Sequence, residues 1–314
     1  MLKRQCYLLL ALGLNLIIIS GCTINCLHFG TEEFTETFDL KDNIIPEDFT
    51  SAAISSQAVN DCVNPSGDTL ESRILPPAGY IRSPTEENSL ASFLRTYPVK
   101  ESDSPLLLYD GTIKKNQSAH AAILQLPLEA EDFQQCADSI MRIYAEYYLS
   151  IGEEEKIRFH FTTGFVAEYA KWMEGYRIDT KNGEFRWVKS AGYDASYENF
   201  TRYMRMVFAY ANTFSMDAFE AKSIDMANIQ IGDIWLEGGS PGHAMMVVDI
   251  CFDENGNKAF LLAQGHMPAQ EFEVMNNPLH PDDPWYYEEE VTYPFITDVH
   301  EFGVGSLQRL NYFP

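Results

Sequence analysis

The spacing of apolar residues is helical in the middle of the chain and changes to that of strands towards its C-terminal end. Asp132 followed three residues later by Gln135 is typical of a capped helix start, and Gly152 is typical of a helix end. Between them, large apolar side chains recur every three or four positions at Ile140, Ile143, Tyr144, Tyr147 and Tyr148. This pattern predicts a helix over 132–152 that buries one face.

Other segments extend this picture to a whole domain. Shorter helices are predicted over 89–99, 166–178 and 196–214. Early strands are predicted over 105–112 (with a turn at Asp110-Gly111), 120–128 and 157–163. Three later segments, IGDIWLE, HAMMVVDICF and KAFLLAQ, predict successive antiparallel strands over 231–237, 243–252 and 258–264, the last two joined by the turn DENGN. Helices followed by antiparallel strands indicate an α+β domain.

The N-terminal segment has the features of an export signal. MLKR is a short basic region, and YLLLALGLNLIII is an apolar run that is short for a membrane span. The following Ile-Ser-Gly-Cys sequence resembles a bacterial lipobox, whose cysteine, here Cys22, is lipidated and becomes the new N-terminus. Because Thr23 rather than aspartate follows, we expect an outer-membrane location. The alternative is an ordinary secretory signal with a coincidental cysteine.

The lipobox resemblance and the composition of the segments that follow it predict three regions along the chain. Residues 1–21 would be a signal peptide, and residues 22–73, which are acidic and show little sustained period, a tether anchored in the bilayer by acylated Cys22. Residues 74–314 would form a single α+β domain. We therefore expect an exported protein of the cell envelope.

Composition and charge narrow the function classes. Hydrophobic residues make up 46% of the 314, which excludes a disordered chain. The formal net charge is −24, from 22 basic and 46 acidic residues, and no basic stripe offsets it. Such a chain repels phosphate backbones, so we do not expect nucleic acid as a partner.

The cysteines and histidines suggest no metal or other cofactor. The chain has neither HExxH nor paired CxxC, and its histidines are scattered singly. An oxidising envelope permits a bridge between Cys26 and Cys62, although sequence alone does not establish the pairing. Cys251 extends an apolar strand and is most simply a core residue. Cys136, near the start of the predicted helix over 132–152, is the remaining candidate for chemistry.

Cys136 precedes a histidine that opens a strand, which is the chain order of papain-like thiol hydrolases. A helix N-terminus lowers the pKa of a thiol and offers N–H groups to an oxyanion. A histidine on a facing strand moves the proton, and a third polar residue orients its ring. We assign these roles to Cys136, His243 and Gln264. His266 follows the strand of Gln264 and is an alternative to His243 or Gln264.

Two binding elements accompany this set. The loop GGSPG before the histidine, with Gly239, Pro241 and Gly242, is suited to close backbone approach and predicts the wall of a cleft. Trp187 lies among polar neighbours, so we expect it at the surface, where a flat aromatic face suits a sugar ring.

The C-terminal half resembles thiol amidases of the CHAP and NlpC types. Gly232-Asp233, Gly242-His243 and Gln264 stand in the order in which those enzymes place Gly-Asp, Gly-His and a polar residue on three strands. From about Tyr80 onward the chain also resembles a family of bacterial envelope lipoproteins defined as a domain of unknown function. The resembling stretches are LLLYDGTIKKNQSAHAAIL, QQCADSIMRIYAEY, GGSPGHAMMVVD and LLAQGHMPAQ.

The amidase resemblance implies a papain-like arrangement, with helices packed on an antiparallel sheet and a helical insertion. It also implies an amidase or peptidase that acts on peptidoglycan or another amide. Two features depart from that pattern: Gln134-Gln135 precede the cysteine, and a cap at Asp132 would place Cys136 at about the fourth helical position. The alternative hypothesis is a non-catalytic glycan- or protein-binding lipoprotein on the same fold, with Cys136 a buried structural thiol and Gln264 a core amide.

Overall fold

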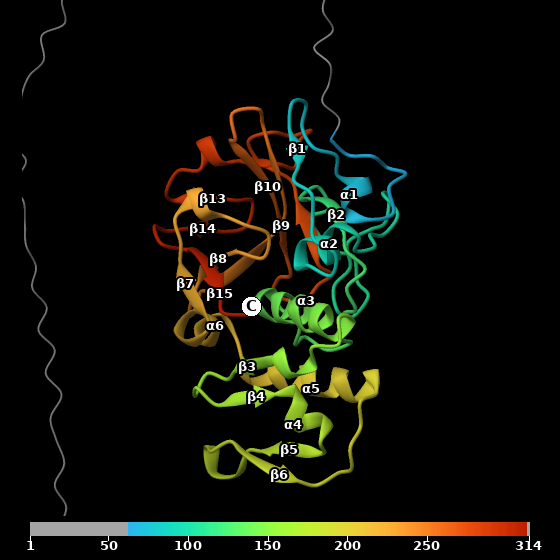
Figure 1. Ribbon diagram of the computed structural model, residues 1–314, viewed down its shortest axis with the longest axis vertical. Coiled ribbons are helices and arrows are strands. Elements are labelled where there is room, and N and C mark those ends of the chain that lie inside the picture. Colours follow the sequence, from blue (N-terminus) through green and yellow to red (C-terminus); the bar gives the residue numbers. More distant parts are fainter. Residues whose placement is uncertain (1–61, 313–314) are drawn as a thin grey trace, which may run out of the picture. The chain divides into compact units, whose positions relative to one another are not determined.

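An antiparallel sheet is the central feature of the computed structural model, which describes residues 62–312 (Figure 1). Within these residues the strand order is β2–β11–β10–β9–β8–β15–β7, and β1 and β12 add to β9 and β10. The nine strands are β1 (Ile81–Arg82), β2 (His120–Ile123), β7 (Ala221–Ser223), β8 (Ile234–Glu237), β9 (His243–Phe252), β10 (Lys258–Gln264), β11 (Glu273–Met275), β12 (Tyr286–Tyr287) and β15 (Leu307–Leu310).

The three predicted late strands are confirmed as β8, β9 and β10, and each is antiparallel to the next. Strand β9 is apolar at almost every position because both of its faces are covered. Met246 and Val248 belong to the main core cluster, whereas Met245 and Val247 belong to a second cluster. Because β9 is packed between two apolar layers, its first residue, His243, is held rigidly at the end of the strand.

Six helices accompany the sheet in the described part of the chain. They are α1 (Leu70–Arg73), α2 (Leu90–Arg95), α3 (Cys136–Ser150), α4 (Tyr169–Met173), α5 (Tyr197–Tyr210) and α6 (Thr213–Phe219). Short 3-10 turns cover Glu154–Lys156, Lys181–Gly183, Met226–Asn228 and Glu288–Glu290. Helix α3 packs against β9 and β10, as predicted, and its apolar face supplies Ile140, Ile143 and Tyr144 to the main core. The domain is therefore α+β.

Two hairpins and two helices are inserted between α3 and α6. The hairpins pair β3 (Arg158–His160) with β4 (Val166–Glu168) and β5 (Tyr176–Asp179) with β6 (Arg186–Lys189). In Figure 1 this insertion lies on the side of α3 away from the main sheet. The predicted helix over 166–178 is wrong, because strand, helix and strand follow one another there. Gly175, with φ +86°, ends α4, and a Cβ there would lie 2.1 Å from the Ala191 carbonyl oxygen.

Two further segments complete the sheet's surroundings. The hairpin of β13 (Phe295–Ile296) and β14 (Glu301–Phe302) contributes to the second core cluster. The predicted strand over 105–112 is not a regular strand, because Leu107 and Leu108 make only isolated bridges.

The packed region begins before residue 74. Leu70 is fully buried and Cys62 is 1% exposed, so the part of the predicted tether from residue 62 belongs to the core, and the predicted boundary lies too late. Arg82 and Arg95 form ion pairs of 2.5 and 2.8 Å with the buried carboxylate of Asp249 on β9, which ties the N-terminal segment to the sheet.

The predictions for the signal peptide over 1–21, for Cys22 and for the Cys26 partner of Cys62 lie outside the described residues. Within residues 62–312, no helix has the length and apolar character needed to cross a membrane.

Candidate functional site

One cavity of about 530 Å³ collects most of the residues predicted to carry chemistry. It lies between the first turn of α3, the start of β9 and three loops. Cys136, His243 and His266 line it, and so does the loop that contains Gly239, Pro241 and Gly242. The other lining residues are Gln135, Ala137, Asp138, Asn212, Thr213, Ser240, Met267, Val299 and His300.

Cys136 is the first residue of α3 rather than its fourth. Gln135 is the N-cap, and its backbone N–H donates to the Asp138 carboxylate at 3.0 Å. Asp132, the predicted cap, instead accepts the backbone N–H of Ala269 at 2.6 Å. The thiol therefore lies among the unpaired N–H groups at the positive end of the helix dipole.

The electrostatic surroundings keep the thiol neutral. Burial, followed by the nearby Asp138 carboxylate, raises the pKa of Cys136 to about 11. The backbone N–H groups of Ala244 and Ala137 act in the opposite direction. Ala244 directly follows His243, so the sulfur lies beside the start of β9. No hydrogen bond joins the thiol to the imidazole of His243 in residues 62–312.

A chain of polar contacts orients His243. Its Nε2 lies 2.6 Å from Oε1 of Gln264, and Nε2 of Gln264 donates to Oε1 of Glu273 at 2.9 Å. Lys114 forms an ion pair of 2.9 Å with the same Glu273 oxygen, and Gln270 donates to it at 2.8 Å. A carboxylate only accepts, so it holds the Gln264 amide with its oxygen towards the ring. His243 therefore carries its proton on Nε2, which leaves Nδ1 as the basic nitrogen.

The imidazole is neutral as well. Burial lowers the pKa of His243 to about 4, and the hydrogen bond that its ring donates to Gln264 only partly opposes this effect. His266 and His300 lower it further, with ring centroids 5.5 and 5.4 Å from that of His243. The site thus holds a thiol and a base that are both uncharged at neutral pH.

The glycines of the loop allow close approach. A Cβ on Gly242 would lie 2.4 Å from the Gly239 carbonyl oxygen and 2.5 Å from Oγ1 of Thr213. Gly239 has φ +108°, a conformation that side chains rarely adopt. At the end of β10, a Cβ on Gly265 would lie 2.5 Å from Oγ of Ser139 on α3. Glycine at these positions brings the loop against α6 and the end of β10 against α3.

Two predicted site residues, Gln264 and Trp187, lie outside the lining of the cavity. Gln264 is fully buried behind His243 and does not line the cavity. Trp187, on β6, does not line it either: its ring packs against Phe165, with a centroid distance of 5.8 Å, and lies under Lys171.

Sequence reasoning missed Asp138, Glu273 and His300. Asp138, three positions after Gln135, carries the local signal of a capping residue. Glu273 and His300 reach the site from separate strands and loops, so no local spacing marks them.

The described residues around the cavity form no metal site. In the part of the chain that the structure describes, no group of three His, Cys, Asp or Glu side chains is arranged to hold an ion. The imidazoles of His266 and His300 lie near that of His243, with ring centroids 5.5 and 5.4 Å away, but Nε2 of His243 is already engaged by Gln264.

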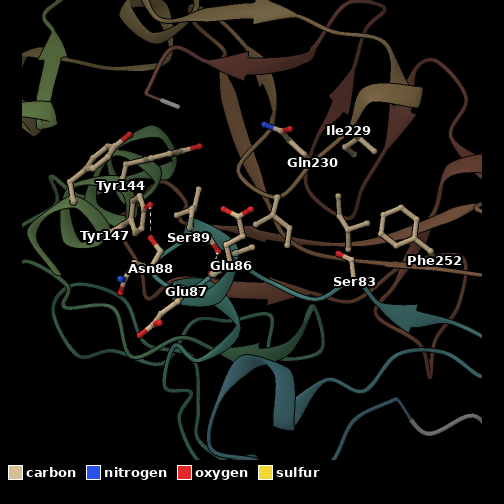
Figure 2. Close-up of a pocket in the computed structure, with 15 residues that line it drawn as sticks. Ser83, Glu86, Glu87, Asn88, Ser89, Tyr144, Tyr147, Ile229, Gln230 and Phe252 are labelled. Atoms are coloured by element: carbon tan, nitrogen blue, oxygen red, sulfur yellow. Dashed lines mark hydrogen bonds between the residues drawn. The ribbon is translucent and has the colours of Figure 1, made fainter. Parts of the chain in front are cut away.

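A second cavity, of about 490 Å³, lies beside later turns of α3 (Figure 2). Figure 2 shows Tyr144 and Tyr147 on one side, with Glu86, Glu87 and Asn88 below them. The Tyr147 hydroxyl donates to the Asn88 carbonyl oxygen at 2.9 Å, and the Tyr144 hydroxyl donates to that of Gly232 at 2.9 Å. The lining has no thiol and no imidazole, so this cavity lacks the nucleophile and the base of a thiol hydrolase.

Comparison with known proteins identifies a family whose function is unknown. No curated protein and no solved structure matches the chain. The family described as "Domain of unknown function (4846)" matches residues 70–309, which include α3, the whole central sheet except the last residue of β15, and every residue that lines the Cys136 cavity. The chain therefore belongs to this family.

Proposed function

We propose that the chain is a thiol hydrolase of papain-like fold that cleaves an amide bond. Cys136 is the nucleophile, His243 the general base, and Gln264 the residue that orients the imidazole. The observation that carries the proposal is that Cys136 opens α3 in the cavity where His243 opens β9, with Nε2 of His243 held by Gln264 at 2.6 Å.

The neutral pair favours general-base attack over a preformed ion pair. As Cys136 sulfur bonds to the amide carbon, its proton passes to Nδ1 of His243 and the carbonyl π electrons move to oxygen. When the C–N bond breaks, that proton leaves with the amine and an acyl thioester remains. Water, activated by the same nitrogen, then hydrolyses the thioester and releases the acid.

The substrate follows from the proposed location. A lipid-anchored envelope protein, attached through Cys22 to the outer membrane, would meet the peptide amides of peptidoglycan. The cavity wall of Gly239, Ser240 and Gly242 offers backbone groups, which suit an extended peptide better than a compact ligand. We therefore propose amides of peptidoglycan stem peptides as the substrate class.

The direct test incubates the purified full chain with peptidoglycan fragments and measures new amino groups and products by mass spectrometry. Wild type should release amines, and Cys136→Ser should not. The matched control is Cys251→Ser, because Cys251 is a buried thiol on β9 outside the cavity. Turnover by Cys136→Ser equal to that of wild type would contradict the proposal.

One observation favours a second candidate, a binding lipoprotein on the same fold. The thiol is neutral, and no hydrogen bond links it to the imidazole in residues 62–312, as expected where the pair is not used. Calorimetry of muropeptide binding separates the two candidates. A binder would bind without turnover and be insensitive to His243→Asn, whereas the hydrolase would turn the ligand over.

The lipid anchor is tested separately from the chemistry. In cells fed a labelled fatty acid, the wild-type chain should carry the label and sediment with outer membranes. Cys22→Ser should lose both properties while the purified chain keeps its activity. Unchanged labelling of Cys22→Ser would contradict the anchor.

A further inference from the structure

One oxygen in the cavity has no partner, although its side chain is almost fully buried. Asp138 is 5% exposed, and its Oδ2 accepts the backbone N–H of Gln135, the N-cap of α3. That bond folds the carboxyl group back over the first turn, where the residue lines the same cavity as Cys136. Oδ1 is buried and makes no hydrogen bond in residues 62–312. A buried oxygen left unpaired is costly, so its partner is expected to arrive with a ligand.

The environment of this carboxyl group favours its neutral form. Burial raises the pKa of Asp138 to about 8, and the N–H bonds from Gln135 and Asp138 only partly offset that effect. The titratable groups that share the cavity are Cys136 on α3, His243 on β9, His266 after β10 and His300 before β14. Cys136 and His243 are neutral at pH 7, and within residues 62–312 no basic side chain shifts the pKa of the carboxyl group.

We propose that Oδ1 of Asp138 carries a proton and donates it in a hydrogen bond to the carbonyl oxygen of the bound substrate, which makes Asp138 a further catalytic residue. This inference rests on the proposed hydrolase function. When sulfur attacks, the oxygen that gains the electron pair accepts hydrogen bonds from Asp138 Oδ1–H and from first-turn N–H groups of α3. No proton is transferred, so the acid is unchanged at the end of the step. A donor aimed at developing charge is worth far more in a buried site than in water.

The test compares two reagents that react with Cys136 in the full chain. p-Nitrophenyl acetate acylates sulfur through a tetrahedral oxyanion, whereas methyl methanethiosulfonate forms a disulfide with no carbonyl group involved. Asp138→Ala should lower the acylation burst at pH 7 on the order of 100-fold, the usual loss for one oxyanion donor, and leave the thiosulfonate rate within about threefold. Asp138→Asn keeps the cap acceptor and an N–H donor, so it should recover most of the burst.

The pH profile gives a readout that a capping role alone would not change. Wild-type acylation should fall as the pH rises through about 8, where the carboxyl group loses its proton. Asp138→Asn should lack that fall. Labelling is assigned to Cys136 by mass spectrometry, with Cys136→Ser as the background.

Three results would overturn the inference. They are equal losses for both reagents in Asp138→Ala, no loss for either, or a wild-type cysteine that reacts with the thiosulfonate but not with the ester. Each is distinct from failure of the proposed function, which is shown by the absence of amide hydrolysis in wild type. A protein that is acylated normally but cleaves no amide would retain the role of Asp138 and lose the substrate class.

Discussion

Helix α3 borders two cavities of nearly equal size, about 530 and 490 Å³, and only one of them is lined by a thiol and imidazoles. The cavity lined by Cys136 (the Cys136 cavity) lies at the first turn of α3. The cavity lined by Tyr144 and Tyr147 (the tyrosine cavity) lies beside later turns of the same helix. In the tyrosine cavity the hydroxyl groups of Tyr144 and Tyr147 donate to backbone carbonyl oxygens. In the Cys136 cavity, Asp138 has an unpaired oxygen and His243 a nitrogen free to accept a proton.

The two cavities differ in whether their polar groups already have hydrogen-bond partners, and not in volume. A cavity whose polar groups are already paired has a structural role, whereas unpaired groups can act on a ligand. A tyrosine hydroxyl that already donates, and whose pKa burial raises as at Tyr147, has no proton to exchange near neutral pH. The first turn of a helix, by contrast, always leaves N–H groups unpaired, and the fold has placed a thiol and an acid there. The following predictions test this difference, beginning with the largest expected effect.

The largest difference in activity is expected between a variant that removes the thiol and a variant in the second cavity. Cys136→Ala should lower amide hydrolysis by a factor on the order of 10⁴ or more, because Cys136 is the proposed nucleophile and no second thiol lines the cavity. Tyr147→Phe, in the second cavity, should leave hydrolysis unchanged and cost about 1 kcal/mol of unfolding free energy for its bond to Asn88. Initial rates and urea unfolding measure both. A similar loss of activity in the two variants would remove the distinction between the cavities.

Changing Glu273, which does not line the cavity, should weaken His243 as a base, because Glu273 holds the orientation of the Gln264 amide. Glu273→Gln permits Gln264 to flip and donate to His243, which would move the imidazole proton to Nδ1. We expect kcat to fall about 10- to 100-fold with little change in KM, as for other residues that orient a functional histidine. Nitrogen NMR of the His243 ring should report the change of tautomer. The matched control is Glu271→Gln, which breaks a Lys100 ion pair away from Gln264 and should leave both readouts unchanged.

Acid should destabilise the fold through His243. Its pKa is about 4 in the folded chain, against 6.5 for the ordinary value, so between these values the unfolded state binds more protons. The free energy of unfolding should therefore fall as the pH drops from about 6.5 towards 4, by no more than about 3 kcal/mol from this group. His243→Asn, which cannot titrate, should show a shallower acid limb in urea unfolding. An identical limb in both proteins would contradict the buried neutral imidazole.

The smallest effect is expected from the loop wall. Gly242→Ala would place a Cβ 2.4 Å from the Gly239 carbonyl oxygen. We therefore expect about 1–3 kcal/mol of lost stability and a higher KM for the substrate. Gly192→Ala is the control, because a Cβ there meets nothing within 4 Å. Thermal unfolding and steady-state kinetics of the two variants measure the difference. Equal stability of the two variants would mean that the loop moves freely.

Local pattern alone was enough to predict the parts of the molecule that repeat with a regular period. The apolar spacing from Ile140 to Tyr148 marked the face of α3, and the unbroken apolar run of β9 marked a strand buried on both sides. These two patterns depend on neighbours in sequence, and their physical cause is local. Cys136, His243 and Gln264 lie far apart in the chain, and they were selected by a resemblance to the chain order of papain-like thiol hydrolases rather than by local pattern.

Tertiary structure decided what depends on residues far apart in the chain. It started α3 at Cys136 because Asp132 accepts the backbone N–H of the distant Ala269, which leaves the neighbouring Asp138 carboxyl group to accept the N–H of Gln135. It also divided 166–178 into strand, helix and strand, and it buried Cys62, Leu70 and Arg73 in a segment that read as a polar tether. Glu273 and His300 reached the site only through strand pairing and loop packing. Hydrophobic periodicity reports which face of a segment is buried, but partners for polar atoms are chosen by the fold as a whole.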